Sequence, residues 1–99
     1  MNSVASTALS GLQTAQMRLN AAANNIANAQ TEGFRRDVVR AQPQAQGGVQ
    51  GRMEKMPEPG SDLAADMVAQ KSATYAFKAN VQMLKTADET LGRLLDTRA

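Results

Sequence analysis

The sequence predicts an all-α protein in which two long helices form an antiparallel coiled-coil hairpin, joined by a flexible linker rich in Gly, Pro and Gln. Apolar residues recur at heptad spacing in both terminal parts, and Gly and Pro concentrate between them. The length of 99 residues allows one small domain, in which only 3% of residues are aromatic. We therefore expect an N-terminal helix in 1–30, the linker in 31–60 and a longer C-terminal helix in 61–99.

The N-terminal helix is predicted from a stripe of alternating small and large apolar residues. The stripe comprises Ala5, Ala8, Leu12, Ala15, Leu19, Ala22 and Ile26. Small residues in such a stripe let two helix axes approach to roughly 8 Å. Only Arg18 is charged among the first thirty residues, and the other polar residues there are Ser, Thr, Asn and Gln. These uncharged faces favour burial against other protein, and the alternative is an ordinary polar helix face.

The linker is predicted from its turn-forming residues, which are Pro43, Gly47, Gly48, Gly51, Pro57, Pro59 and Gly60. Within the linker, residues 34–40, with the sequence FRRDVVR, could make a short extended strand. The C-terminal helix is predicted from heptad-spaced Leu63, Met67, Thr74, Phe77, Val81, Leu84, Leu91 and Leu95, with Ser61 or Asp62 as its N-cap.

The C-terminal helix is expected to span roughly 50 Å. It is longer than its partner, so part of its apolar face has no partner within the chain. We therefore expect the hairpin to be stable mainly inside an assembly.

The composition excludes several classes of function. The chain has no Cys and no His, which removes thiolate metal sites and the usual general base. We expect no enzyme activity, metal or cofactor, no membrane insertion, and no cleaved Sec signal. A nucleic-acid interface at Arg35, Arg36, Arg40 and Arg52 is disfavoured, because acids are interleaved with these arginines and the formal net charge is only +2.

Three asparagines, Asn24, Asn25 and Asn28, lie close together near the end of the first helix. Asn is a poor residue for a helix interior. One interpretation is a helix C-terminus, with Gly33 past a capping turn and Phe34 folding back as a hydrophobic clasp. That interpretation explains one Asn and the Gly. The other interpretation is that the amides bridge neighbouring backbones in repeated subunit packing.

The sequence ANNIANAQTEGFRR, residues 23–36, resembles the N-terminal signature of the bacterial flagellar axial proteins, which form the rod and hook. The matching residues are Asn24, Asn25, Ile26, Ala27, Asn28, Thr31, Gly33 and Phe34. Residues 73–95 resemble the C-terminal segment of the same family through Phe77, Ala79, Asn80, Thr86, Ala87, Asp88, Leu91, Leu94 and Leu95. Gln30 and Tyr75 depart from the family pattern, and the short middle segment resembles a minimal rod-type member.

The resemblance implies a structural subunit of the basal-body rod or proximal hook, located in the periplasmic rod region. Its partners would be other axial proteins, further copies of itself, and the flagellar type III export apparatus. The assembly interface is expected at Asn24, Asn25, Ile26, Asn28, Thr31, Gly33, Phe34, Phe77, Asn80, Leu84, Leu91, Leu94 and Leu95. Asn80 and Asp88 interrupt the apolar stripe, either as register-setting residues or as solvent-facing edges. The alternative function is a soluble coiled-coil adaptor or export chaperone of the flagellar system.

Overall fold

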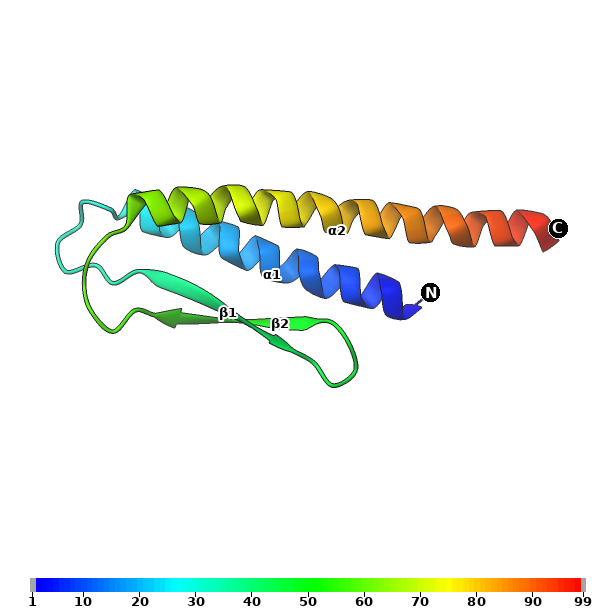
Figure 1. The fold of residues 1–99 in the computed structure, drawn as a ribbon, viewed down its shortest axis with the longest axis horizontal. Helices are drawn as coiled ribbons and strands as arrows, with labels where there is room; N and C mark the ends of the chain where they lie inside the picture. Colours follow the sequence, from blue (N-terminus) through cyan, green and yellow to red (C-terminus); the bar gives the residue numbers. More distant parts are fainter. Residues whose placement is uncertain (1, 99) are drawn as a thin grey trace.

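The computed structural model describes residues 2–98, with side chains over 4–96, and contains two helices and two strands. In chain order these are α1 (Asn2–Ala27), β1 (Asp37–Pro43), β2 (Val49–Lys55) and α2 (Leu63–Arg98). The helices run antiparallel and the strands lie on the side of α1 away from α2 (Figure 1). Met1, at the start of the predicted range 1–30, and Ala99, at the end of the predicted range 61–99, lie outside the described residues.

The predicted all-α class is wrong, because the segment expected to be a flexible linker forms a β-hairpin. β1 and β2 pair antiparallel, from Asp37 opposite Lys55 to Pro43 opposite Val49. Gly47 and Gly48 adopt φ values of 95° and 81°, which only Gly reaches without strain, and so reverse the chain. The Gln44 amide donates to the Gly48 carbonyl at 3.0 Å and closes the turn. The Gly and Pro residues that indicated a linker instead shape this turn and its flanks.

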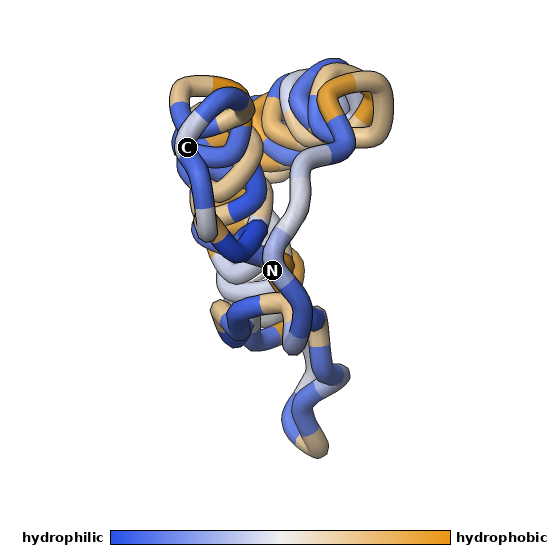
Figure 2. Tube along the Cα trace, turned by 90° about the vertical axis from the view of Figure 1, so that its left-hand side faces the viewer, coloured by the Kyte–Doolittle hydropathy of each residue, from blue (hydrophilic) through white to orange (hydrophobic). Residues whose placement is uncertain are grey.

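The hairpin is ordered because it packs on α1. An isolated two-stranded sheet is at best marginally stable in water. Here the Val49 amide donates to the Ser10 hydroxyl of α1 at 3.1 Å. Close packing of the strand on the helix also depends on Gly51, where an added Cβ would lie 3.0 Å from the Met17 sulfur. Viewed along its long axis, the molecule shows the hairpin extending away from the pair of helices (Figure 2).

The two helices pack through small residues. The buried apolar side chains are all alanines: Ala8, Ala15, Ala21, Ala22 and Ala73. Gly11 of α1 faces Asn80 of α2 so closely that an added Cβ would lie 2.5 Å from the Asn80 Oδ1. The heptad stripe therefore predicts the correct face of α1, and its small residues form the tightest contacts.

α2 is the longer helix, with 36 residues against 26 in α1. At 1.5 Å per residue it is roughly 15 Å longer. Its C-terminal end projects beyond the start of α1 (Figure 1). The predicted cap is confirmed at Asp62, whose Oδ1 accepts a hydrogen bond from the Ala65 amide at 3.1 Å. The molecule is elongated, measuring 63 × 25 × 13 Å.

Candidate assembly interface

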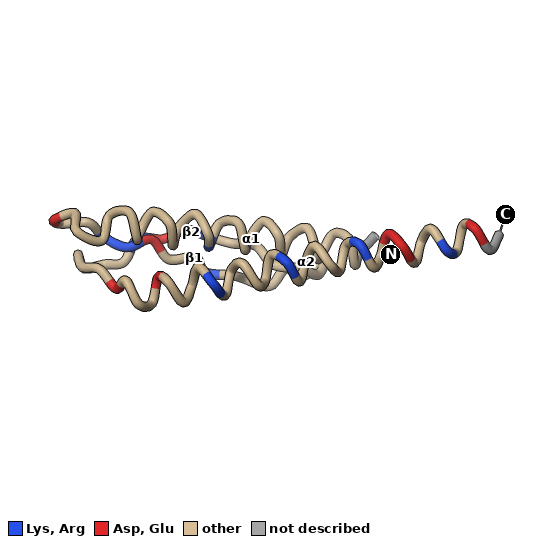
Figure 3. Tube along the Cα trace, turned by 90° about the horizontal axis from the view of Figure 1, so that it is seen from above, with Lys and Arg blue, Asp and Glu red and all other residues tan. Residues whose placement is uncertain are grey.

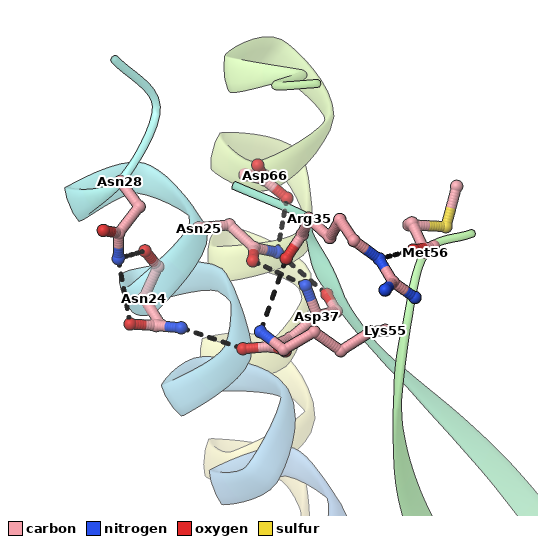
Figure 4. A network of polar contacts seen from close by, with 8 residues as sticks. All are labelled: Asn24, Asn25, Asn28, Arg35, Asp37, Lys55, Met56 and Asp66. Atoms are coloured by element: carbon pink, nitrogen blue, oxygen red, sulfur yellow. Dashed lines mark hydrogen bonds and ion pairs between the residues drawn. The ribbon is translucent and has the colours of Figure 1, made fainter. Parts of the chain in front are cut away.

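Asn25 of α1 lies at the meeting point of α1, β1 and α2 and is only 3% exposed. Its Oδ1 accepts a hydrogen bond from the Asp37 amide at 2.8 Å, and its Nδ2 donates to the Asp37 carbonyl at 2.8 Å. The same Nδ2 donates to Asp66 Oδ1 at 3.1 Å (Figure 4). The side-chain amide thus pairs with the edge of β1 as a neighbouring strand would, and also holds α2.

The carboxylate of Asp37, the first residue of β1, interacts with two further side chains. Asn24 Nδ2 donates to its Oδ2 at 2.8 Å, and Lys55 Nζ lies 2.9 Å from its Oδ1. Burial raises the pKa of the Asp37 carboxyl, but the Lys55 and Asn24 contacts outweigh burial and hold that pKa below its ordinary value of 3.8. The carboxylate is therefore held in its charged form between α1 and β2.

Asp66 in the first turn of α2 is 2% exposed and pairs with Arg36. Arg36 Nε donates to Asp66 Oδ2 at 3.1 Å, and its Nη2 donates to Oδ1, so the contact is bidentate. The hydrogen bond to Asp66 raises the pKa of Arg36 above its ordinary value, even though burial opposes the charge. We name the cluster of Asn24, Asn25, Arg36, Asp37, Lys55 and Asp66 the polar junction.

Asn28 and Thr31 complete the end of α1. Asn28 Nδ2 donates to the Asn24 carbonyl at 2.9 Å and to Asn24 Oδ1 at 3.1 Å, while Thr31 Oγ1 donates to Asn28 Oδ1 at 3.1 Å. Gly33 follows with a φ of 76°. The three asparagine amides are therefore hydrogen-bonded within the chain, with Asn25 buried and Asn24 exposed at the surface.

Phe34 lies beside the polar junction, half-buried, with Lys55 Nζ 4.9 Å from its ring centroid. The chain returns past it, since the Gly60 amide donates to the Phe34 carbonyl at 3.1 Å. Arg35 Nε likewise donates to the Met56 carbonyl at 2.7 Å. These bonds join the segment that precedes β1 to the segment that follows β2, at the open end of the hairpin.

The remaining predicted interface residues fall into two groups. Ile26, Phe77, Asn80 and Leu84 are half-buried along the helix pair. Leu91, Leu94 and Leu95, which are 44%, 53% and 62% exposed, lie near the C-terminal end of α2. The structure therefore brings the Asn-rich turn together with the hairpin, and places the three leucines at the opposite end of the molecule.

Sequence reasoning missed four residues of the polar junction: Arg36, Asp37, Lys55 and Asp66. The sequence places Arg36, Asp37 and Lys55 in the predicted linker and Asp66 in the predicted C-terminal helix, and it indicates no partner for any of them. Their partners are far apart in the chain, so no spacing pattern connects them. The signal in the sequence that pointed to such partners is the presence of three Asn side chains near one helix end. A buried amide needs polar partners, so polar groups from elsewhere in the chain had to be near it.

Large apolar side chains are left uncovered along the molecule. Among the described residues, none of the large side chains is fully buried. The exposed ones are Val4, Leu9, Met53, Leu63, Met67, Val68, Tyr75, Met83, Leu91, Leu94 and Leu95. A groove of 410 Å³ between the start of α1 and α2 is lined mainly by Val4, Ala79, Met83 and Ala87.

Two chemical features are absent from the described part of the chain. Residues 2–98 hold no group of three or more acidic side chains arranged to bind a metal ion. Neither helix in this range has the length and apolar character needed to cross a membrane. What the geometry offers is a set of packing surfaces.

The comparison with protein families identifies the N-terminal part of the chain. The family model described as Flagella basal body rod protein matches residues 6–35, which cover most of α1 and the Asn-rich turn that follows. A search of curated proteins finds no match. The family match confirms the predicted resemblance and supports a structural role in the flagellar basal body. Over residues 6–35, the N-terminal third of the chain, the sequence is thus similar to the flagella basal body rod protein family.

Proposed function

We propose that the chain is a structural subunit of the flagellar rod or proximal hook that assembles through its paired terminal helices. The observation that carries this proposal is the contrast between an all-alanine core and the exposed Leu, Met, Val and Tyr side chains. Burying one Leu-sized side chain contributes about 1.5–3 kcal/mol. Most of that stabilisation is still available to contacts with neighbouring subunits.

We propose different parts in assembly for the predicted interface residues. Asn25 acts inside the chain, where it fixes the angle between α1, β1 and α2. Asn24, Thr31 and Gly33 are exposed at the end of α1, with Asn28 and Phe34 half-buried beside them. They would set the packing angle of the next subunit. Leu84, Leu91, Leu94 and Leu95 would bury their side chains against neighbouring helices, and Ile26, Phe77 and Asn80 would hold the helix pair that presents them.

The route of export and the location are part of the same proposal. The chain would pass unfolded through the flagellar type III export apparatus and assemble in the periplasmic rod region, without a cleaved Sec signal. A fold whose buried side chains are small and whose helices have few intramolecular anchors is suited to export in an unfolded state. Self-association of the isolated chain follows from the same exposed apolar side chains.

Quantitative mass spectrometry of purified hook–basal bodies, together with a deletion strain tested for swimming, examines this proposal. We expect stoichiometric amounts of the chain in the particles and loss of motility on deletion, restored by the wild-type gene. Absence from purified particles, with the chain recovered instead in complexes with unassembled axial proteins, would contradict the rod role and favour the adaptor or export chaperone.

A further inference from the structure

The C-terminal end of α2, which projects beyond the start of α1 (Figure 1), carries uncovered leucines. We name residues 88–96 the tail. Its Leu91, Leu94 and Leu95 are all exposed. The tail also carries Asp88, Glu89 and Asp96 against Arg93. Figure 3 shows these charges as two acidic bands separated by a basic one on the projecting helix.

A pocket of complementary character lies at the opposite end of the molecule. Its volume is 320 Å³ and its walls come from α1, β1 and the first turns of α2. Ala21, Ala22, Val38 and Val39 supply apolar lining, and Arg18 supplies a positive charge. We name this feature the Arg18 pocket.

Arg18 is the uncompensated charge of this pocket. The other charged groups that line it are already paired, since Arg36 binds Asp66 and Asp37 binds Lys55. No ion pair or hydrogen bond joins Arg18 to another side chain among residues 2–98. It is also the only charged residue within α1. The pocket therefore favours an apolar segment that carries an acid.

The tail fits this description, but it cannot reach the pocket of its own chain. Ala69, which lines the pocket, and Leu91 belong to one continuous helix. At 1.5 Å per residue they are roughly 33 Å apart. A tail can fill the pocket only in a second molecule.

We propose that the tail of one copy docks into the Arg18 pocket of the next, with the leucines against the alanine and valine walls and the acids facing Arg18. The two surfaces differ, so the contact is heterologous, and a joined pair still has one free tail and one free pocket for further copies. The molecules would add head to tail. This inference rests on the proposed structural role and names the contact through which copies join.

Sedimentation velocity of the purified full chain over a concentration series tests the contact. The wild type is expected to form larger species as concentration rises. Charge reversal by Arg18→Glu, or by Asp88→Lys with Asp96→Lys, should weaken association by roughly tenfold or more. Replacement of Leu91, Leu94 and Leu95 by Gln should abolish it. Circular dichroism confirms that each variant keeps its helices.

The decisive sample is an equimolar mixture of the Arg18→Glu protein with the Asp88→Lys/Asp96→Lys protein. Each variant alone places like charges together, whereas in the mixture every pocket meets a tail of opposite charge. Association should therefore return to nearly the wild-type level. Lys71→Glu is a matched control for Arg18→Glu, because both substitutions lower the net charge by the same amount. Lys71 is an exposed residue of α2 outside the pocket.

Two results would overturn the proposal: a wild-type chain that stays monomeric at all concentrations, or a mixture that associates no better than its components. Failure of this contact is distinguishable from failure of the rod role. A chain present in basal bodies whose mixed variants do not associate refutes the contact alone. A chain absent from basal bodies refutes the rod role, while the mixing result still decides the contact.

Discussion

At the scale of single residues, the structure is held at one point by an amide. Asn25 uses both its donor and its acceptor atoms to join the edge of β1 to Asp66 of α2. Two carboxylates, Asp37 and Asp66, are buried beside it and paired with Lys55 and Arg36. Buried charges of this kind are stable only while each keeps its partner. Substituting a residue of the polar junction should therefore lower the free energy of unfolding by more than the number of contacts of that residue suggests.

Asn25→Ala is expected to destabilise the chain strongly. The substitution leaves the Asp37 amide and carbonyl without their partner, and each buried polar group left unpaired costs roughly 1–3 kcal/mol. Urea unfolding followed by circular dichroism measures the change. Asn20→Ala, at an exposed position of the same helix, should change the unfolding free energy by less than about 0.5 kcal/mol. Equal losses in the two variants would show that the amide of Asn25 does not hold the junction.

Stability should fall in acid because of Asp37. Its pKa is lower in the folded chain than the ordinary 3.8, so its contribution is complete above that value and is lost as pH falls through the folded pKa. The raised pKa of Arg36 has the opposite sign: its contribution is complete at neutral pH and is lost only as pH rises, in strong alkali, through the folded pKa.

Comparing the wild type with Asp37→Asn isolates this contribution. Chemical unfolding at a series of pH values should show a large stability difference near neutral pH that shrinks as pH falls below about 3.8. A difference that is constant over the whole pH range would mean that the Asp37 charge is not linked to folding.

At the scale of elements, small residues let neighbouring backbones come close together, both where the helices pair and where the hairpin packs on α1. Alanines and Gly11 let α1 and α2 pack tightly, and Asn80 lies in the space that Gly11 leaves. The hairpin packs on the other side of α1 by the same means. A Cβ at Gly48 would lie 2.6 Å from the Ser10 hydroxyl, and the φ of Gly48 is 81°. Glycine is therefore needed at both contacts for space.

Gly11→Ala should weaken the helix pair although Ala is the better helix former. Its methyl group overlaps the Asn80 amide, and overpacking of this kind costs about 1–3 kcal/mol. Gly92→Ala is the matched control, because nothing lies within 4 Å of that site. There the propensity gain of about 1 kcal/mol should appear as stabilisation. The unfolding midpoints of the two variants show whether each substitution stabilises or destabilises the chain.

The double variant Gly11→Ala/Asn80→Ala tests the cause of the Gly11 effect. Removing the amide of Asn80 makes room for the new methyl group, so part of the lost stability should return. If Gly11→Ala instead stabilises the chain as much as Gly92→Ala does, the helices are not in close contact at this level.

At the scale of the whole molecule, an elongated shape and a core of small side chains leave much apolar surface uncovered. Hydrophobic burial is roughly proportional to the apolar area removed from water. A molecule of 63 × 25 × 13 Å removes little of it within one chain. Under the proposed function, association with further copies or with other rod proteins would remove more apolar area from water and would couple the stability of the fold to assembly.

The thermal unfolding midpoint of the isolated chain should therefore rise with protein concentration. Partners that bind only the folded state stabilise it by mass action. Differential scanning calorimetry over a wide concentration range measures this effect, and the variant with Gln at Leu91, Leu94 and Leu95 should show a smaller dependence. A cooperative melt of a monomer at high temperature, independent of concentration, would contradict the prediction.

The sequence by itself determined the two helices, the small-residue stripe of α1, a cap at Ser61 or Asp62 and the greater length of α2, because heptad spacing and capping depend on residues near one another in the chain. It also carried the resemblance to the rod family, through the motif around Asn24–Phe34. Only the tertiary structure decided that residues 37–55 form a hairpin, that Asn25 turns inward, and that Arg36 pairs with Asp66 thirty residues away. Those outcomes depend on contacts between distant segments. A weak strand sequence becomes ordered when a helix supplies the hydrogen bonds and packing that its own residues lack.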